Sequence, residues 1–202
     1  AIGLQLTQLG VHPRLGLLMV EAQRHGRSRL GCDLAALLSD RDPLSAAEVG
    51  CDLEARLEAM GEQKRCKPLR ELSRQLERQL ERLGIDPDAE GTGIDSAQLI
   101  LTAFPKWLAL QRPGQTGRYR LRQGRGAILR PTDPLAGSEA LAVARLDMGQ
   151  RDTRIQLAVP LSRQRVEQLA LQQGEWLDQV SWDDKSERIR AERQLKLGAL
   201  VI

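Results

Sequence analysis

The spacing of apolar residues changes from helical to alternating near Pro113, and that change limits the folds open to this chain. From residue 12 to about residue 104, apolar residues recur every three or four positions, which is typical of amphipathic helices. The clearest case is PLRELSRQLERQLERLG, residues 68–84, where five leucines form one stripe and Gly84 marks the end. After Pro113, apolar and polar residues alternate, as in strands. We therefore expect an α+β chain, with an all-helical unit followed by a small β barrel or sandwich.

Local signals predict further elements. HPRLGLLMVEAQRHG (12–26) predicts a helix that begins at a proline and ends at a glycine, and SRLGCDLAALLSDRDP (28–43) predicts a second helix that ends at Pro43. The segment IDPDAEGTGID (85–95) predicts a connector that bends the chain. GRYRLR (117–122), the turn QG and RGAILR (125–130) predict a hairpin, and alternation also predicts strands at 139–146 and 153–159. Residues 162–174 predict a helix capped by Ser162, and residues 176–202 a closing hairpin that turns at Asp183–Ser186.

Positive charge is concentrated in one window. The chain has 30 basic and 27 acidic residues, a formal net charge of +3, and every stretch outside residues 96–132 is slightly negative. That window holds no Asp or Glu, and its seven cations are Lys106, Arg112, Arg118, Arg120, Arg122, Arg125 and Arg130. Surfaces selected for solubility usually mix both signs, so an acid-free basic block indicates a partner rich in phosphate.

Alternation in GRYRLR places Arg118, Arg120 and Arg122 on one face of a strand. Guanidinium groups suit phosphate oxygens because they are permanently charged and offer forked donors. We expect the seven cations to bind the backbone of a single-stranded nucleic acid without reading its sequence. Two alternatives remain open: the basic face docks an acidic protein as an interaction module, or some of these arginines form ion pairs with acids elsewhere.

The remaining candidates favour structural roles. His12 and His25 flank a predicted helix, so we expect a cap and a dipole partner rather than catalytic groups. Three cysteines without metal or redox spacing are expected to be reduced thiols in or near a core. Aromatic residues are scarce, and each is expected to anchor the core rather than stack on bases: Phe104, Trp107, Tyr119, Trp176 and Trp182. Tyr119 stays open as a stacking candidate, although alternation turns it away from its arginine neighbours.

No combination of nucleophile, base and orienting group stands out, so a self-contained hydrolase is disfavoured. The phosphate-binding loop Gly-x-x-x-x-Gly-Lys-[Ser/Thr] and any Asp-Glu-x-His sequence are absent from the sequence, so the chain is not an ATP-driven motor by itself. We expect no catalytic, metal or cofactor-binding residues in it. The longest uncharged stretch near the middle is too short to cross a bilayer and no secretory signal opens the chain, so we expect a cytoplasmic protein that does not bind membranes.

Six segments in this order resemble the carboxy-terminal region of HrpB-type ATP-dependent helicases, which belong to the DEAH-like RNA helicases. They are LTQLGVHPRLGLLMVEA, LAALLSDRDPL with DLEARL, AFPKWLALQR, GRYRLRQGRGAILRPTDPLAGSEALAVARLD, RIQLAVPL and RIRAERQLKLGALV. The resemblance covers nearly the whole chain and is weakest between residues 60 and 95. Where the family usually has an Asp-Arg-Ile run, this chain has Lys106, Trp107 and Leu108.

The resemblance implies a domain organisation. Residues 1–10 resemble the tail of a winged-helix unit, residues 11–104 a helicase-associated, ratchet-like helical bundle, and residues 105–202 a small OB-like barrel with a carboxy-terminal helix, a hairpin and a family-specific extension. It also implies partners. We expect single-stranded RNA rather than DNA, and RecA-like motor domains of the same parent chain that would hold the ATP and magnesium.

Overall fold

The computed structural model describes residues 9–39, 43–44, 46–87, 93–148, 153–183 and 187–202. Most of the predicted winged-helix tail, the end of the second helix, part of the 85–95 connector and most of the last hairpin turn lie outside the described residues. No helix in the described ranges is long and apolar enough to cross a membrane.

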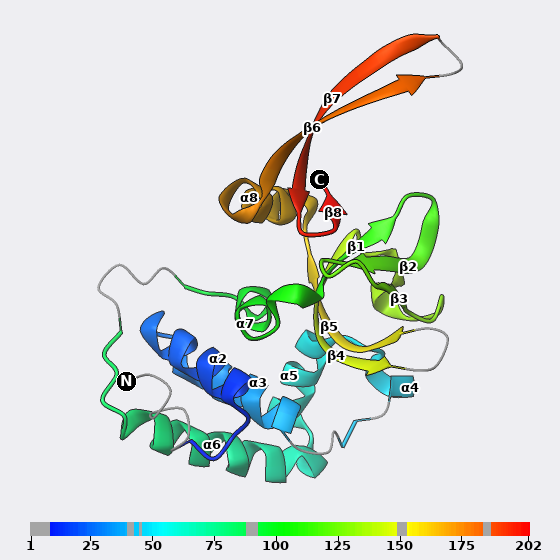
Figure 1. Cartoon of the computed structure of the whole chain (residues 1–202). Coiled ribbons are helices and arrows are strands. Elements are labelled where there is room, and N and C mark those ends of the chain that lie inside the picture. The colour runs from blue at the N-terminus through cyan, green and yellow to red at the C-terminus, as the bar shows by residue number, and fades with distance from the viewer. Residues whose placement is uncertain (1–8, 40–42, 45, 88–92, 149–152, 184–186) are drawn as a thin grey trace.

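The first half of the chain is helical, as the sequence predicts. Its α-helices are α2 (Pro13–Arg24), α3 (Ser28–Ser39), α4 (Ala46–Val49), α5 (Leu53–Glu62), α6 (Lys67–Glu81) and α7 (Ser96–Ala103). Short 3-10 turns, η1 (Lys64–Cys66) and η2 (Pro105–Trp107), precede α6 and the first strand. In Figure 1, α2, α3 and α6 lie together at the base, and α7 lies between them and the strands.

Capping explains where several helices begin. The His12 side chain accepts a hydrogen bond from the Arg14 N–H, and Asp95 forms a capping box with Gln98 at the start of α7. Gly26 and Gly84, which follow α2 and α6, have positive φ angles of 65° and 61°. The predicted start of the 12–26 helix and the predicted stops at Gly26 and Gly84 are confirmed.

The second half contains a closed five-stranded barrel. Its strands are β1 (Leu108–Arg112), β2 (Gln115–Leu121), β3 (Gly126–Ile128), β4 (Ala140–Met148) and β5 (Thr153–Leu161). The barrel order is β1-β2-β3-β5-β4, and a parallel β3–β5 pair together with the antiparallel β1–β4 pair closes it. A 3-10 turn, η3 (Pro134–Gly137), crosses from β3 to β4. The sequence left barrel and sandwich open, and the structure resolves this in favour of a barrel.

A helix and a hairpin follow the barrel, as predicted. Helix α8 (Arg163–Gln173) begins at Ser162, whose side chain accepts a hydrogen bond from the Arg165 N–H. Strands β6 (Glu175–Asp183) and β7 (Arg188–Leu197) pair antiparallel along their length, and β8 (Leu200–Val201) pairs with the end of β7. Figure 1 shows the hairpin projecting away from the helices and the barrel.

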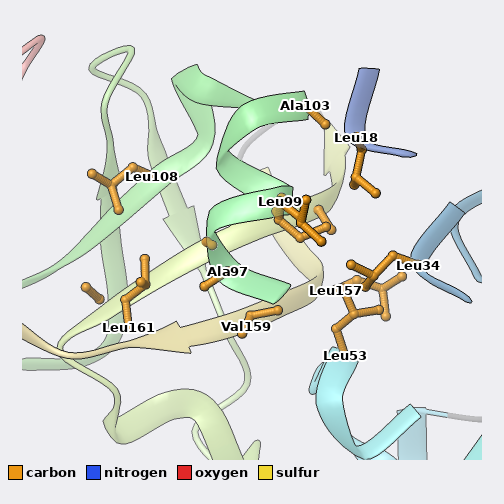
Figure 2. Packing of buried hydrophobic residues seen from close by; sticks show 14 of the residues in the cluster. Leu18, Leu34, Leu53, Ala97, Leu99, Ala103, Leu108, Leu157, Val159 and Leu161 are labelled. Atoms are coloured by element: carbon orange, nitrogen blue, oxygen red, sulfur yellow. The ribbon is translucent and has the colours of Figure 1, made fainter. Parts of the chain in front are cut away.

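One hydrophobic cluster joins these parts. It contains Leu18 and Leu34 from the helices, Leu99 from α7, and Leu157 and Val159 from the outer face of β5. Figure 2 shows Leu18 and Leu34 pointing from the helices toward Leu99 of α7 and Leu157 of β5. A second cluster fills the barrel interior around Tyr119, and a third packs α2, α3 and α6. The outer face of β4 and β5 is therefore covered by helices, whereas β2 keeps an outer face open to solvent.

Candidate nucleic-acid interface

Strand β2 presents two of the predicted arginines to solvent. Its side chains alternate, with Arg118 and Arg120 exposed and Tyr119 and Leu121 buried. The inward residues pack in the barrel interior, which forces their neighbours to point outward. The predicted alternation is confirmed for residues 118–121, whereas Arg122 lies outside the strand. The predicted hairpin is confirmed as well, because Arg118 pairs with Ile128 and Arg120 pairs with Gly126 across β2 and β3.

A hollow on this side of the barrel collects three of the seven cations. It has a volume of about 220 Å³, and its lining includes Arg112, Arg118 and Arg125. Gly126 forms part of its floor, and a Cβ atom at this position would lie 3.2 Å from Nη2 of Arg112. The bare backbone of Gly126 thus lets the Arg112 guanidinium lie close over β3. Pairing of β1, β2 and β3 brings together cations that stand up to thirteen positions apart in the sequence.

Three arginines of this surface, Arg112, Arg118 and Arg120, are not neutralised by a neighbouring carboxylate among the described residues. Elsewhere ion pairs between an arginine and a carboxylate do occur, for example Arg29 with Asp33 at 3.1 Å. Exposed guanidinium groups without a local counterion keep their donors available to an anion that arrives from solution.

Arg122 has a different environment. It follows β2 and is half-buried, and its Nη1 donates a hydrogen bond to Oε1 of Gln173 at 3.1 Å. Its carbonyl oxygen accepts a hydrogen bond from the Ala199 N–H at 2.8 Å. A Cβ atom at Gly198 would lie 2.6 Å from that carbonyl oxygen, so the chain approaches Arg122 very closely there. Arg122 therefore joins the barrel to α8 and the β7–β8 turn.

The remaining two cations lie apart from this hollow. Lys106 is exposed on η2, and Arg130 is exposed after β3. Arg130 lines a larger hollow of about 1030 Å³ between the α4–α5 region and the barrel. The structure thus divides the seven predicted residues among several places, with Arg112, Arg118 and Arg125 as the group it brings together.

Sequence reasoning missed the basic residues of the larger hollow. Besides Arg130, its lining includes Arg56, Arg145 and Arg154, together with Asp133 and Asp147. Arg56 is only 2% exposed, and its Nη1 donates to the carbonyl oxygen of Asp52 at 3.0 Å. These arginines stand in segments of mixed charge, so no local excess of positive charge distinguished them.

Tyr119 lies inside the barrel and does not face a ligand surface. It is fully buried, and its hydroxyl lies 2.9 Å from the carbonyl oxygen of Leu135 and 3.0 Å from that of Ser138. Burial raises the pKa of Tyr119 to about 12. The side chain therefore connects β2 to the η3 segment, and base stacking on its ring is excluded by its position.

The prediction that every aromatic residue anchors the core is wrong for two tryptophans. Trp176 and Trp182 expose 53% and 60% of their surface on β6. The hairpin projects from the body, and only its base, including Leu195 and Leu197, joins the core. By contrast, Phe104 and Trp107 stack at 4.7 Å between ring centroids and pack against core clusters, as predicted.

The histidines and cysteines have structural environments. His12 caps α2, and Nε2 of His25 lies 3.4 Å from Oε1 of Glu21 in the last turn of that helix. Cys32 and Cys66 are buried, Cys51 is half-buried, and none of these three described cysteines forms a disulfide. Burial raises the pKa of Cys32 to about 12 and is also the main cause of the similar shift of Cys51.

Comparison with known proteins agrees with this architecture. Residues 173–202 match the family described as "ATP-dependent RNA helicase HrpB, connector region". The ATP-dependent RNA helicase HrpB of Escherichia coli strain K12 is 29% identical over 204 residues, an alignment that covers 100% of this chain and 24% of that protein.

Two solved structures have the same fold over the whole chain. A crystal structure of the E. coli DExH-box NTPase HrpB matches with a TM-score of 0.78 and 29% identity, and one of the E. coli DEAH/RHA helicase HrpB with a TM-score of 0.77 and 28% identity. Each match covers 100% of this chain and 24% of the other. The chain thus spans about a quarter of the length of the relatives it matches. In sequence and in fold, the chain is similar along its full length to the carboxy-terminal part of HrpB-type helicases.

Proposed function

We propose that this chain is a nucleic-acid-binding accessory region of an ATP-dependent, HrpB-type helicase. In this proposal the barrel holds the backbone of a single strand while motor domains of a longer parent chain move that strand. The observation that carries the proposal is the hollow lined by Arg112, Arg118 and Arg125. The exposed Arg120 lies on the same strand as Arg118. Among the described residues, Arg112, Arg118 and Arg120 have no carboxylate partner.

The chemistry of this face suits phosphate. Arginine forks donate two parallel hydrogen bonds to phosphate oxygens, and these contacts carry no sequence information. Five-stranded OB-type barrels bind oligonucleotides on the face of strands 2 and 3, and here β2 and β3 carry or flank Arg118, Arg120 and Arg125. RNA is the proposed strand because the E. coli relative is described as an RNA helicase.

The remaining parts of the proposal concern the parent protein. The helical unit, residues 11–104, would line the exit path of the strand, and the unit formed by residues 105–202 would grip it. ATP and magnesium would be held by RecA-like domains outside this chain, so we expect no ATP turnover by the chain alone. Such a protein would act in the cytoplasm.

A salt titration of RNA binding tests the proposal. Changing both Arg118 and Arg120 to alanine is expected to weaken binding of a fluorescent single-stranded RNA. Each lost phosphate contact reduces the log–log salt dependence by about 0.7, so the slope should become shallower by about 1.4. Arg122 is left unchanged because it contacts Gln173 and Ala199. If it were replaced, a loss of RNA binding could not be distinguished from a loss of structure.

The matched control changes Arg74 and Arg78 to alanine. Both are exposed on α6, away from the barrel, so this variant loses the same charge from another surface. We expect its salt slope to stay within error of the unchanged protein. Equal salt slopes for all three proteins would show that β2 does not bind the RNA backbone.

The main competing function is docking of an acidic protein on the same face, since arginine forks also bind carboxylates. Under that alternative an acidic partner would bind, the Arg118 and Arg120 variant would lose it, and single-stranded RNA would not compete. Competition by RNA instead supports the proposed function.

A further inference from the structure

The hairpin of β6 and β7 carries an exposed apolar face. Four of its large side chains expose half or more of their surface: Trp176 (53%), Val180 (69%), Trp182 (60%) and Ile189 (70%). The strand register pairs Trp182 with Ile189 and Val180 with Ala191. Directly opposed residues of an antiparallel pair lie on the same side of the sheet. These residues therefore form one surface, which we call the hairpin face.

Contacts along the hairpin face confirm this alignment. Arg193 forms an ion pair with Asp178 at 3.5 Å, and its guanidinium carbon lies 5.5 Å from the centre of the Trp176 ring. At the base of the hairpin, Leu195 and Leu197 are buried in the main hydrophobic cluster. The hairpin face thus continues outward from the core, and no described part of the chain covers its outer half.

The edge of β6 is also open. The sheet order is β6-β7-β8, so among the described residues the nine-residue β6 pairs on one side only. Edge strands normally carry lysines, prolines or bulges that prevent further pairing. The β6 sequence, EWLDQVSWD, has no lysine and no proline, and its register with β7 is continuous from Glu175 to Asp183. A long, regular edge of this kind is suited to accept another strand.

The charges of β6 and β7 indicate what kind of strand would pair with the open edge of β6. β6 contains three acids, Glu175, Asp178 and Asp183, and no basic residue. Its present partner, β7, has the sequence RIRAERQLKL, with four basic residues and one acid. β6 therefore pairs on its closed side with a basic strand of alternating pattern, and each of its acids stands opposite a basic residue of β7. A basic strand on the open side would flank the same acids from the other direction. β6 itself has no basic residue that could bind phosphate, which argues against nucleic acid as the occupant.

We propose that the open edge of β6 accepts an extended, basic segment of a partner protein as an additional strand. The backbone of that segment would pair with β6, and its apolar side chains would cover Trp176, Val180 and Trp182. Its lysines or arginines would lie near the acids of β6. This site is separate from the arginine-lined hollow and does not depend on the proposed role in nucleic-acid binding.

A peptide with the sequence of residues 188–197 is a direct probe, because it carries the pattern that β6 already accepts. Adding it to the whole chain is expected to shift the tryptophan fluorescence to shorter wavelength in a saturable way. Hydrogen exchange should show new protection at alternate amides of residues 175–183, since only one set of backbone groups faces the open edge. A peptide with all Arg and Lys residues replaced by Glu is expected not to bind.

Two lysine variants distinguish an effect of the hairpin face on peptide binding from an effect of overall charge. Val180→Lys places a charge on the hairpin face and should weaken peptide binding about tenfold. Gln179→Lys adds the same charge to the opposite side of the same strand, and we expect less than about a threefold effect. Circular dichroism establishes that both variants keep the native content of strand.

Three results would overturn the proposal. One is no saturable binding of the basic peptide up to about 1 mM, and another is binding without new protection in β6. The third is concentration-dependent self-association of the chain that Val180→Lys abolishes, which would identify a second copy as the occupant.

Discussion

Among single residues, Tyr119 shows how a side chain between two exposed arginines can have a purely structural role. Its hydroxyl lies within hydrogen-bonding distance of the buried carbonyl oxygens of Leu135 and Ser138. Tyr119→Phe removes the donor, and we expect the free energy of unfolding to fall by about 1 kcal/mol in urea titrations. Binding of single-stranded RNA should be unchanged. Weaker RNA binding with unchanged stability would show that the ring contacts the ligand after all.

The buried thiols give a prediction about pH. Burial raises the pKa of Cys32 and Cys51 from 9.0 to about 12, so the folded chain holds these protons more tightly than the unfolded chain. The stability that they contribute is complete below pH 9 and is lost as the pH rises toward 12. Urea midpoints should therefore fall between pH 8 and pH 10.

Thiol reactivity provides an independent check of the same burial. At pH 8, Cys32 and Cys51 should react with a disulfide reagent far more slowly in the native chain than in urea, because little thiolate is present. Rapid reaction of either residue in the native chain would contradict the raised pKa.

The arginines show which features of single residues the sequence could predict. The exposure of Arg118 and Arg120 follows from an alternation of neighbouring residues, so it could be predicted locally. The role of Arg122 could not, because its partner Gln173 is 51 positions away. The exposure of Trp182 was missed for a similar reason: composition favours burial of tryptophan, but only the tertiary structure shows that the hairpin leaves the body.

At the scale of elements, Asp133 links the helical half to the barrel. Its Oδ1 accepts the Leu135 N–H at 3.0 Å at the start of η3, and its Oδ2 accepts the Cys51 N–H at 2.9 Å. Asp133→Ala leaves both donors without this partner, and we expect the free energy of unfolding to fall by about 2 kcal/mol. Asp133→Asn retains one acceptor oxygen, and its free energy of unfolding should fall by about half as much. Equal losses would mean that charge, rather than the two hydrogen bonds, matters.

Element types were easier to predict than their pairing. The α6 stripe and the β2 alternation are local patterns, and both elements form where the sequence places them. Closure of the barrel depends on the parallel pairing of Ala127 with Thr153 and of Ile128 with Arg154. No local pattern encodes a contact between strands separated by β4, so barrel and sandwich could not be distinguished by periodicity.

At the scale of the whole molecule, the shared hydrophobic cluster predicts a single unfolding transition. Leu99 is fully buried between the helices and the barrel, and Leu99→Ala is expected to lower the free energy of unfolding by about 3 kcal/mol. Hydrogen exchange should accelerate in α2 and in β4 alike, because both pack on this cluster. Acceleration confined to the helices would show that the two halves unfold independently.

The position of α7 between the two halves has a practical consequence for protein engineering. Its side chains meet the helices on one side and β4 and β5 on the other, so it belongs equally to both. A chimera that exchanges barrels between related proteins at the boundary of residues 104 and 105 would set α7 against a foreign surface. Recombination should instead transfer α7 together with the strands it covers.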